Sequence, residues 1–387
     1  MVKNTKKKEI FSVICNPGFE DLVSLEIKRI LGVDSKKGNS FVSFESSYEQ
    51  ALLFAYLSQS SKKILKKISN YSAKNHNEII EKSKENVYSF DGSFCVRSSI
   101  HSLEKDLGAV VHSKIENPSV DLVNPKNSIY FHVHETSGNF DVLCGFDLTN
   151  SDLSKRTYKI FSHPSSIKGT LAYYMVLLSG YAGKGMILDP CSGSCTIPIE
   201  AAYLATGFSL RYYDKDDLLQ QCYRESAGNN DMIDNIKSML DEYDNKVLTG
   251  LKKNKISKKT KIVSYDVDLQ AVNSAKKNTK IGGVDKHISI ARGDIDWLET
   301  KFEESSVDFI VSNPPHYSKT NIKKNDKFFD KFFYQTEYVL SKKGKITLLT
   351  NSNRIIDIAK KYKLISKIER RFNQGSFEHS IISFVKD

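Results

Sequence analysis

An asparagine followed by two prolines, Asn313-Pro314-Pro315, is the most specific chemical motif of the chain. The prolines restrict the backbone, so that the Asn313 side-chain oxygen and the Pro314 carbonyl can both point into a cleft as acceptors. Two such acceptors can hold the hydrogens of an exocyclic amine and turn its lone pair toward a methyl sulfonium. An aromatic side chain after the prolines, His316 or Tyr317, could stack on the base that carries the amine. The alternative interpretation is a structural turn.

A loop of small residues stands between an expected strand and an expected helix at residues 189–196. Small side chains let a ligand approach the backbone closely, and the first turn of the following helix offers free amides. The loop has neither the Gly-Lys-Ser/Thr ending of a phosphate-binding loop nor the full glycine pattern of a dinucleotide fold. By itself it indicates a nucleotide-like ligand only weakly.

Three further acids follow expected strands. Asp266 is placed to hydrogen-bond a ribose diol, whereas Asp268 is predicted to cap the next helix. Asp294 could accept from an adenine amine while Ile295 packs on the ring. For this last pair alone, an ordinary turn is the preferred interpretation.

Strands and helices alternate in the C-terminal half, which predicts an α/β fold with a mostly parallel sheet and helices on both faces. The tail is predicted to end in an antiparallel hairpin formed by residues 365–372 and 381–385. The expected strands are residues 186–188, 261–265, 288–291, 307–311 and 345–349. The expected helices are residues 197–205, 269–280, 327–340 and 355–362.

The N-terminal half mixes short strands with helices, which predicts α+β structure. The first helix is expected at residues 19–31, with Gly32 as its stop signal. We divide the chain into an N-terminal α+β domain (1–77), a second α+β domain (78–149), a linker (150–165) and a third domain (166–387). Residues 208–259 form a long polar insertion with helical character at 232–243.

Charge, hydrophobic runs and cysteine spacing limit the classes of function that the chain can have. The net charge is +11, from 57 basic and 46 acidic residues, and favours a polyanionic partner. None of the apolar runs is long enough to span a bilayer, and the basic start leads into no apolar signal core. The six cysteines include no pair of CxxC sites. We therefore expect a reduced, cytoplasmic protein with neither membrane nor metal as a partner.

Taken in order, these motifs resemble those of the class I Rossmann-fold methyltransferases that act on amines, which have a mostly parallel seven-stranded sheet. Residues 189–202 are similar to the family's D-P-x-C-G-S-G-T-I-P-I-E-A-A run. The resemblance implies S-adenosyl-L-methionine as cofactor and residues 313–317 as the catalytic element. Asp266 would then bind ribose, with Asp294 and Ile295 at the adenine. The other cofactor-binding residues that it implies are Thr170, Asp189, Cys191, Ser192, Gly193, Ser194 and Asn313.

The resemblance extends upstream. Residues 15–20 look like the P-x-G-L-E start of THUMP-containing RNA methyltransferases, and residues 94–147 resemble the THUMP domain itself. Residues 145–159 and 163–172 match the family's junction and helix entry. The similarity is greatest to guanine-N2 methyltransferases of tRNA and rRNA. It implies a ferredoxin-like and a THUMP-like module before the catalytic domain, and RNA, with tRNA favoured, as partner.

Two departures from the family pattern leave alternatives open. Cys195 replaces the second loop glycine and could crowd the cofactor, and His316 stands where the family has tyrosine. A catalytically degenerate RNA-binding protein therefore remains an alternative. Methylation of an adenine amine, of an rRNA guanine, or of a protein or DNA amine are others. Carbon methylation is disfavoured for want of a cysteine in a suitable motif, and a Cys191–Cys195 metal pair is disfavoured for want of a second pair.

Overall fold

The computed structural model describes residues 8–149, 151–162, 166–219, 230–252, 260–317, 320–374 and 377–387. It divides into two compact units, one of residues 1–154 and 211–245, the other of residues 155–210 and 246–387. The chain therefore passes between the units three times. The polar insertion expected at 208–259 contributes to both.

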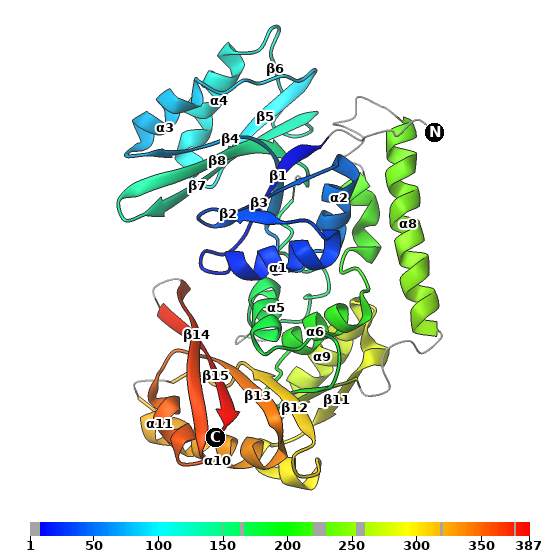
Figure 1. The fold of residues 1–387 in the computed structure, drawn as a ribbon, viewed down its shortest axis with the longest axis vertical. Helices are drawn as coiled ribbons and strands as arrows, with labels where there is room; N and C mark the ends of the chain where they lie inside the picture. Colours follow the sequence, from blue (N-terminus) through cyan, green and yellow to red (C-terminus); the bar gives the residue numbers. More distant parts are fainter. Residues whose placement is uncertain are drawn as a thin grey trace. The chain divides into compact units, whose positions relative to one another are not determined.

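One eight-stranded sheet forms the first unit (Figure 1). Its strands are β1 (Glu9–Ile14), β2 (Ser35–Lys37), β3 (Phe41–Ser46), β4 (Lys63–Ala73), β5 (Ser93–Ser98), β6 (Ser119–Val120), β7 (Asn127–Thr136) and β8 (Asn139–Asp147). Their order is β2-β3-β1-β4-β8-β7-β5-β6. Because β4 pairs with both β1 and β8, the sheet runs through both expected N-terminal domains.

Helices cover this sheet in two groups. They are α1 (Glu20–Leu31), α2 (Tyr48–Leu57), α3 (His76–Ser83), η1 (His101–Leu103) and α4 (Glu104–Ser113). Helix α1 ends at Gly32 with φ of 72°, as its sequence predicts. Helix α2 begins after Ser47, whose side chain accepts from the Gln50 amide. Helix α3 spans the expected boundary between residues 77 and 78.

Most of the insertion's described residues belong to the first unit. The insertion contains η2 (Tyr212–Asp214) and the 23-residue helix α8 (Asn230–Lys252). The buried Tyr56 hydroxyl of α2 lies 2.9 and 2.8 Å from the two carboxylate oxygens of Asp244 in α8. Lys215 pairs with the same carboxylate at 2.5 Å. A buried, charge-assisted contact therefore fastens α8 to α2.

The second unit is a seven-stranded sheet in the order β11-β10-β9-β12-β13-β15-β14. Strands β9 to β13 pair in parallel, and the chain ends in the antiparallel hairpin β14–β15. The prediction of a mostly parallel sheet with a terminal hairpin is thus confirmed. The strands are β9 (Met186–Asp189), β10 (Lys261–Asp266), β11 (Ile288–Arg292), β12 (Val307–Ser312), β13 (Leu340–Thr350), β14 (Leu364–Gln374) and β15 (Phe377–Lys386).

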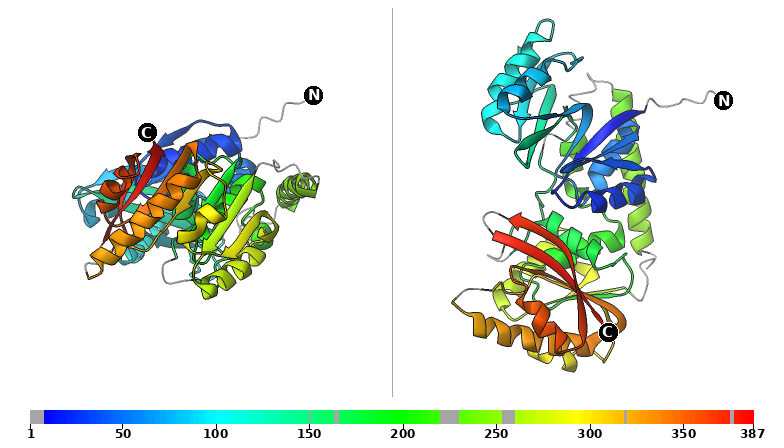
Figure 2. Two further views of the ribbon diagram at one scale, coloured as in Figure 1. Left: turned by 90° about the horizontal axis from the view of Figure 1, so that it is seen from below. Right: turned by 60° about the vertical axis from the view of Figure 1, so that its left-hand side comes forward.

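Helices lie on both sides of this sheet. Figure 1 shows α5, α6 and α9 on one side and α10 and α11 on the other, and Figure 2 shows the same layers from two further directions. The described helices of this unit are α5 (Gly169–Leu178), α6 (Thr196–Thr206), α9 (Leu269–Ile281), η3 (Asp285–His287), η4 (Ile295–Thr300), α10 (Ile322–Val339) and α11 (Arg354–Lys360). Phe329, Phe332 and Phe333 of α10 belong to the same buried core cluster as Ile310 and Leu348.

Among the described residues, no helix is long and apolar enough to cross a membrane. In the same part of the chain, no three histidine, cysteine or acidic side chains gather as a metal site.

Candidate active site

Three candidate side chains meet at one edge of the second sheet. Strand β9 ends at Asp189 and pairs in parallel with β10, which ends at Asp266. Strand β12 lies on the other side of β9 and ends at Ser312, directly before Asn313. Because parallel strands end at the same edge of a sheet, motifs far apart in the sequence become neighbours there.

Asp189 is buried, and the Asp266 carboxylate is a charged neighbour. Its Oδ1 accepts hydrogen bonds from the Ser312 hydroxyl at 2.6 Å and from the Cys191 amide at 3.2 Å. Burial outweighs these hydrogen bonds and raises the pKa of this carboxyl to about 7. Asp189 can therefore change charge near neutral pH.

Asp266 ties the small-residue loop to β10. Its Oδ2 accepts from the Gly193 amide at 2.7 Å, and its Oδ1 accepts from the Asp268 amide at 2.9 Å. The Ser192 amide donates to the Tyr265 carbonyl at 2.9 Å. The loop is thus held in place by the second acidic motif, and each oxygen of Asp266 keeps a further lone pair.

Cys195 points away from the loop surface. It adopts a left-handed backbone with φ of 72°, which explains why a glycine suits this position. Its thiol is buried and lies 3.4 Å from the Ser264 hydroxyl, which in turn donates to Ser192 at 2.7 Å. The side chain is directed into the sheet, where it does not obstruct a ligand over the loop.

A pocket opens over this loop. Six predicted site residues line it: Asp189, Cys191, Ser192, Gly193, Ser194 and Asn313. The other four lining residues, Ser166, Ile167, Thr196 and Ile197, were not among the predicted site residues. The Ser166 hydroxyl lies 3.1 Å from that of Ser194 and 3.3 Å from that of Thr196. The segment before α5 therefore closes one side of the pocket.

Four predicted cofactor residues, Thr170, Asp266, Asp294 and Ile295, do not line this pocket. Thr170 is fully buried in the first turn of α5, and its hydroxyl has no hydrogen-bond partner among the described residues. Asp294 is exposed and caps η4 by accepting from the Asp296 amide at 3.2 Å. Ile295 is buried in the core beside Leu298. By contrast, the prediction that Asp268 caps α9 is confirmed, since it accepts from the Gln270 amide at 2.9 Å.

The Asn-Pro-Pro loop places its residues at different depths. Pro314 is buried, Asn313 is partly buried, and Pro315 and His316 are exposed. His316 Nε2 lies 3.0 Å from Asn313 Oδ1. Although the His316 ring touches solvent, partial desolvation and the neighbouring His379 lower its pKa below the ordinary value.

Tyr317 packs back into the fold. Its ring stacks on Phe329 with centroids 5.2 Å apart and planes at 2°. Its hydroxyl donates to Asp326 at 3.0 Å, and Asp326 pairs with Arg354 at 2.8 Å. Burial and the Asp326 carboxylate raise the pKa of Tyr317 well above its usual range. Of the two aromatic candidates, His316 is the one that remains exposed beside Asn313.

Side chains from two other elements hold the loop backbone. Asn351 accepts from the Tyr317 amide and donates to the Tyr317 carbonyl, each at 2.9 Å. Asn325 of α10 donates to the His316 carbonyl at 2.9 Å. Sequence reasoning missed both asparagines because neither belongs to a recognisable motif.

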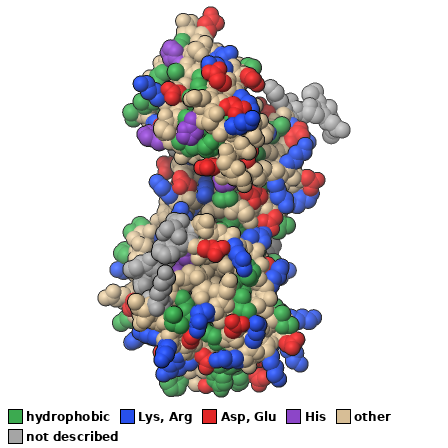
Figure 3. Space-filling model, turned by 90° about the vertical axis from the view of Figure 1, so that its left-hand side faces the viewer, with side chains coloured by type: hydrophobic (Ala, Val, Ile, Leu, Met, Phe, Trp, Pro, Cys, Tyr) green, Lys and Arg blue, Asp and Glu red, His purple; other side chains and the backbone are tan. Residues whose placement is uncertain are grey.

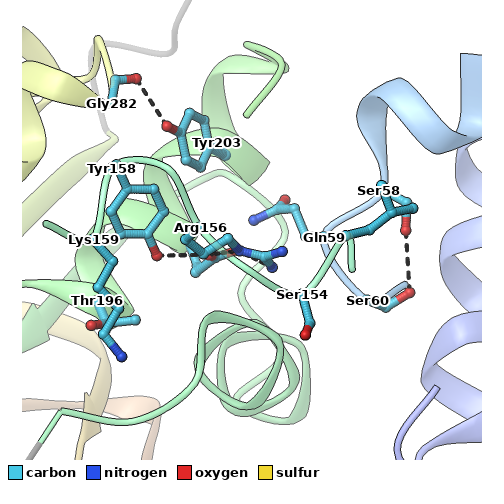
Figure 4. Close-up of polar contacts among 12 residues, drawn as sticks. Ser58, Gln59, Ser60, Ser154, Arg156, Tyr158, Lys159, Thr196, Tyr203 and Gly282 are labelled. Atoms are coloured by element: carbon cyan, nitrogen blue, oxygen red, sulfur yellow. Dashed lines mark hydrogen bonds and ion pairs between the residues drawn. The ribbon is translucent and has the colours of Figure 1, made fainter. Parts of the chain in front are cut away.

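A buried ion pair lies near the start of the second unit, and Figure 4 labels two of the residues involved, Arg156 and Tyr158. Arg156 Nε donates to Glu200 Oε1 of α6 at 2.7 Å, and both side chains are fully buried. The Tyr158 hydroxyl donates to the same oxygen at 2.8 Å. A Cβ on Gly169 would meet both Arg156 and Glu200 at less than 3 Å, so the pair also requires a glycine at the start of α5.

The fold is found in solved structures at low sequence identity. It matches SMU.472 in complex with SAH (TM-score 0.72, 18% identity, 99% of each chain) and TrmN from Thermus thermophilus (TM-score 0.65, 19% identity, 98% of this chain and 100% of that one). The second unit therefore has the class I methyltransferase fold.

Residues 156–381 match the family model described as RMKL-like, methyltransferase domain, and the chain belongs to that family. It is 28% identical over 219 residues to the tRNA (guanine(6)-N2)-methyltransferase of Methanocaldococcus jannaschii, covering 56% of this chain and 52% of that protein. It is 26% identical over 347 residues to the ribosomal RNA large subunit methyltransferase K/L of Desulfotalea psychrophila, covering 81% of this chain and 44% of that protein. The chain thus spans about half the length of these relatives.

Proposed function

We propose that this chain transfers a methyl group from S-adenosyl-L-methionine to an exocyclic base amine in RNA, with guanine N2 of tRNA as the target. The observation that carries the proposal is that Asp189 and Asn313 line one pocket. A carboxyl suited to a cationic ligand and an amide oxygen suited to a base amine therefore share one cavity.

The residues present fit this cofactor. Asp189, once ionised, suits the cofactor's ammonium, and the loop of Ser192 and Gly193 presents little side-chain bulk to a ligand. When bound, the cofactor supplies a methyl group on a sulfonium whose departure leaves a neutral thioether.

The Asn-Pro-Pro loop would orient the base. Asn313 Oδ1 and the Pro314 carbonyl each accept one hydrogen of the exocyclic amine, which points the nitrogen lone pair toward the methyl group. The exposed His316 ring stacks on the base. The new N–C bond forms as the S–C bond breaks, and the amine then releases one proton to solvent.

The relatives support RNA and guanine N2 as the substrate class. Both are named as RNA methyltransferases, one of them acting on guanine N2 of tRNA. Large-subunit rRNA is the second candidate substrate, favoured by the longer match of 347 residues. The amine of adenine could meet the same two acceptors, so the base must be identified in the product.

The first unit would bind the RNA. We propose that it contains a ferredoxin-like domain (1–77) and a THUMP-like domain (78–149), joined by a linker (150–165) to the catalytic domain (166–387). The net charge of +11 supports a polyanionic partner. On the face drawn in Figure 3, basic side chains are interspersed with acidic ones in each unit. Recognition through the shape of the RNA suits such a surface.

Calorimetry followed by methyl transfer tests the proposal. The purified chain is titrated with S-adenosyl-L-methionine with and without bulk tRNA, and then incubated with labelled cofactor and tRNA or rRNA. Mass analysis of digested RNA identifies the base. Asn313→Ala should lose about 100-fold or more in turnover while keeping RNA binding. Absence of cofactor binding in both conditions would support a binding-only protein, and equal loss of turnover and RNA binding would reject the role of Asn313.

A further inference from the structure

Three aromatic rings run from the Asn-Pro-Pro loop into the terminal hairpin. The centroids of His316 and His379 are 5.2 Å apart, with planes at 57°. On β14, Phe372 stacks against His379 at 6.0 Å and 27°. The loop after β12 and strand β15 therefore meet through two histidines.

The orientation of His316 is set at both its backbone and its ring. Asn325 holds its carbonyl, and its Nε2 lies 3.0 Å from Asn313 Oδ1. Since an amide oxygen only accepts hydrogen bonds, Nε2 carries the hydrogen in this contact. The ring is thus positioned relative to the amide that would hold the target amine.

The ring of His379, on β15, packs against the ring of His316. The His379 side chain is buried at 8% exposure, and its Nδ1 has no hydrogen-bond partner among the described residues. No hydrogen bond at Nδ1 fixes the imidazole, so packing between Phe372 and His316 sets the ring's place. His379 therefore touches the loop through its ring, which contacts that of His316.

We propose that His379 is a positioning residue for the methyl-transfer step, supporting His316 so that the two histidines form the platform on which the target purine stacks. The inference rests on the proposed function and deepens it. Truncation of His379 would leave the base amine free to drift from its acceptors, and a small displacement of a reacting atom is costly.

The charge state of the platform follows from its surroundings. The pKa values of both histidines lie below the ordinary range because of desolvation, and a charge on His379 lowers that of His316 further. Other described charged groups near the loop include Asp189 in the pocket and the Asp326–Arg354 pair at Tyr317. A protonated His316 repels the positive charge that develops on the amine. Methyl-transfer activity should therefore fall as pH drops and His316 becomes protonated.

Steady-state kinetics of the full chain with bulk tRNA and labelled S-adenosyl-L-methionine test the inference. His379→Ala should lower kcat at least tenfold while the cofactor Kd stays within twofold. His379→Phe keeps a ring and should retain most of kcat at pH 8. The acid limb of its pH profile of kcat should move to higher pH, because the positive charge on His379 that opposes protonation of His316 is gone. His287→Phe is the matched control, because His287 directly precedes β11, at the amino end of the strand, whereas the site lies at the carboxyl ends of the neighbouring parallel strands.

The outcomes separate the two proposals. The inference would be overturned, and the proposed function left standing, if the wild type is active and two further results hold. These are a wild-type kcat in His379→Ala and an unchanged acid limb of the pH profile in His379→Phe. A wild type that binds cofactor but methylates no RNA would overturn both. Equal losses in His379→Ala and His379→Phe, with an unmoved acid limb and lowered Tm, would assign His379 a structural role and also overturn the inference.

Discussion

The Ser312 hydroxyl donates a 2.6 Å hydrogen bond to Asp189, and both residues are buried. Ser312 directly precedes Asn313, and Asp189 opens the small-residue loop. The bond therefore joins the residue proposed to meet the cofactor to the loop proposed to meet the base. We expect a change at Asp189 to alter cofactor binding first and the placement of Asn313 second.

Cofactor affinity should depend on pH through Asp189. Its pKa of about 7 results from burial, and a cationic ligand binds best to the ionised carboxyl. Affinity should therefore fall as pH drops through this value, by about tenfold between pH 8 and pH 6. Calorimetry across that range measures the effect. Asp189→Asn should bind weakly with little pH dependence, and a wild type with constant Kd would contradict the assignment.

The same carboxyl should make the unliganded fold less stable at alkaline pH. Its folded pKa of about 7 exceeds the ordinary 3.8, so the folded state binds more protons between these values. Stability then declines as pH rises through that window and levels off above it. Urea unfolding at several pH values should show Asp189→Asn gaining stability over wild type at pH 8 but not at pH 4. A gain that is the same at both would contradict this linkage.

Local sequence signals predicted the elements of the second unit and some of their ends. The cap of α9 was predictable, because Asp is a preferred N-cap residue and Asp268 stands directly before the helical pattern. The same chemistry explains Asp294, which caps η4, so that acids after neighbouring strands look alike in sequence. The sequence alone does not separate a capping carboxyl from a ligand-binding one.

Partners contributed by distant segments could not be predicted. The sequence allowed either His316 or Tyr317 to face the base, and the choice depends on Phe329 and Asp326 of α10. His379 is brought to His316 by the antiparallel pairing of β15 with its neighbouring strands. A local pattern carries no information about such register.

Cys195 should be replaceable by glycine with little effect on cofactor binding. Its thiol points to Ser264, so the family's glycine would relieve backbone strain of about 1 kcal/mol at the expense of buried packing. The cofactor Kd of Cys195→Gly should stay within about threefold of wild type. Cys195→Val should lower Tm, because a branched side chain resists a left-handed backbone. Tenfold tighter binding in Cys195→Gly would show that the thiol crowds the cofactor.

Breaking the buried pair at the start of the second unit should be costly. Glu200→Ala leaves the Arg156 guanidinium buried without its carboxylate, a loss of about 3–5 kcal/mol in the free energy of unfolding. The matched control is Asp357→Ala, which removes an exposed pair with Lys360 and should cost under about 1 kcal/mol. Urea unfolding measures the loss of unfolding free energy in each variant. Equal small losses would contradict the prediction and would mean that water solvates the Arg156 guanidinium.

Asn351 should act on turnover and leave cofactor affinity unchanged. It holds the Tyr317 backbone through two 2.9 Å hydrogen bonds, just beyond His316. Asn351→Ala removes both and should lower kcat about tenfold, whereas Asn351→Asp keeps the acceptor for the Tyr317 amide and should recover part of it. Asn353→Ala is the matched control, because Asn353 precedes α11 without a side-chain capping bond. If kcat stays at the wild-type level in Asn351→Ala while Tm falls, the asparagine stabilises the fold without positioning the loop.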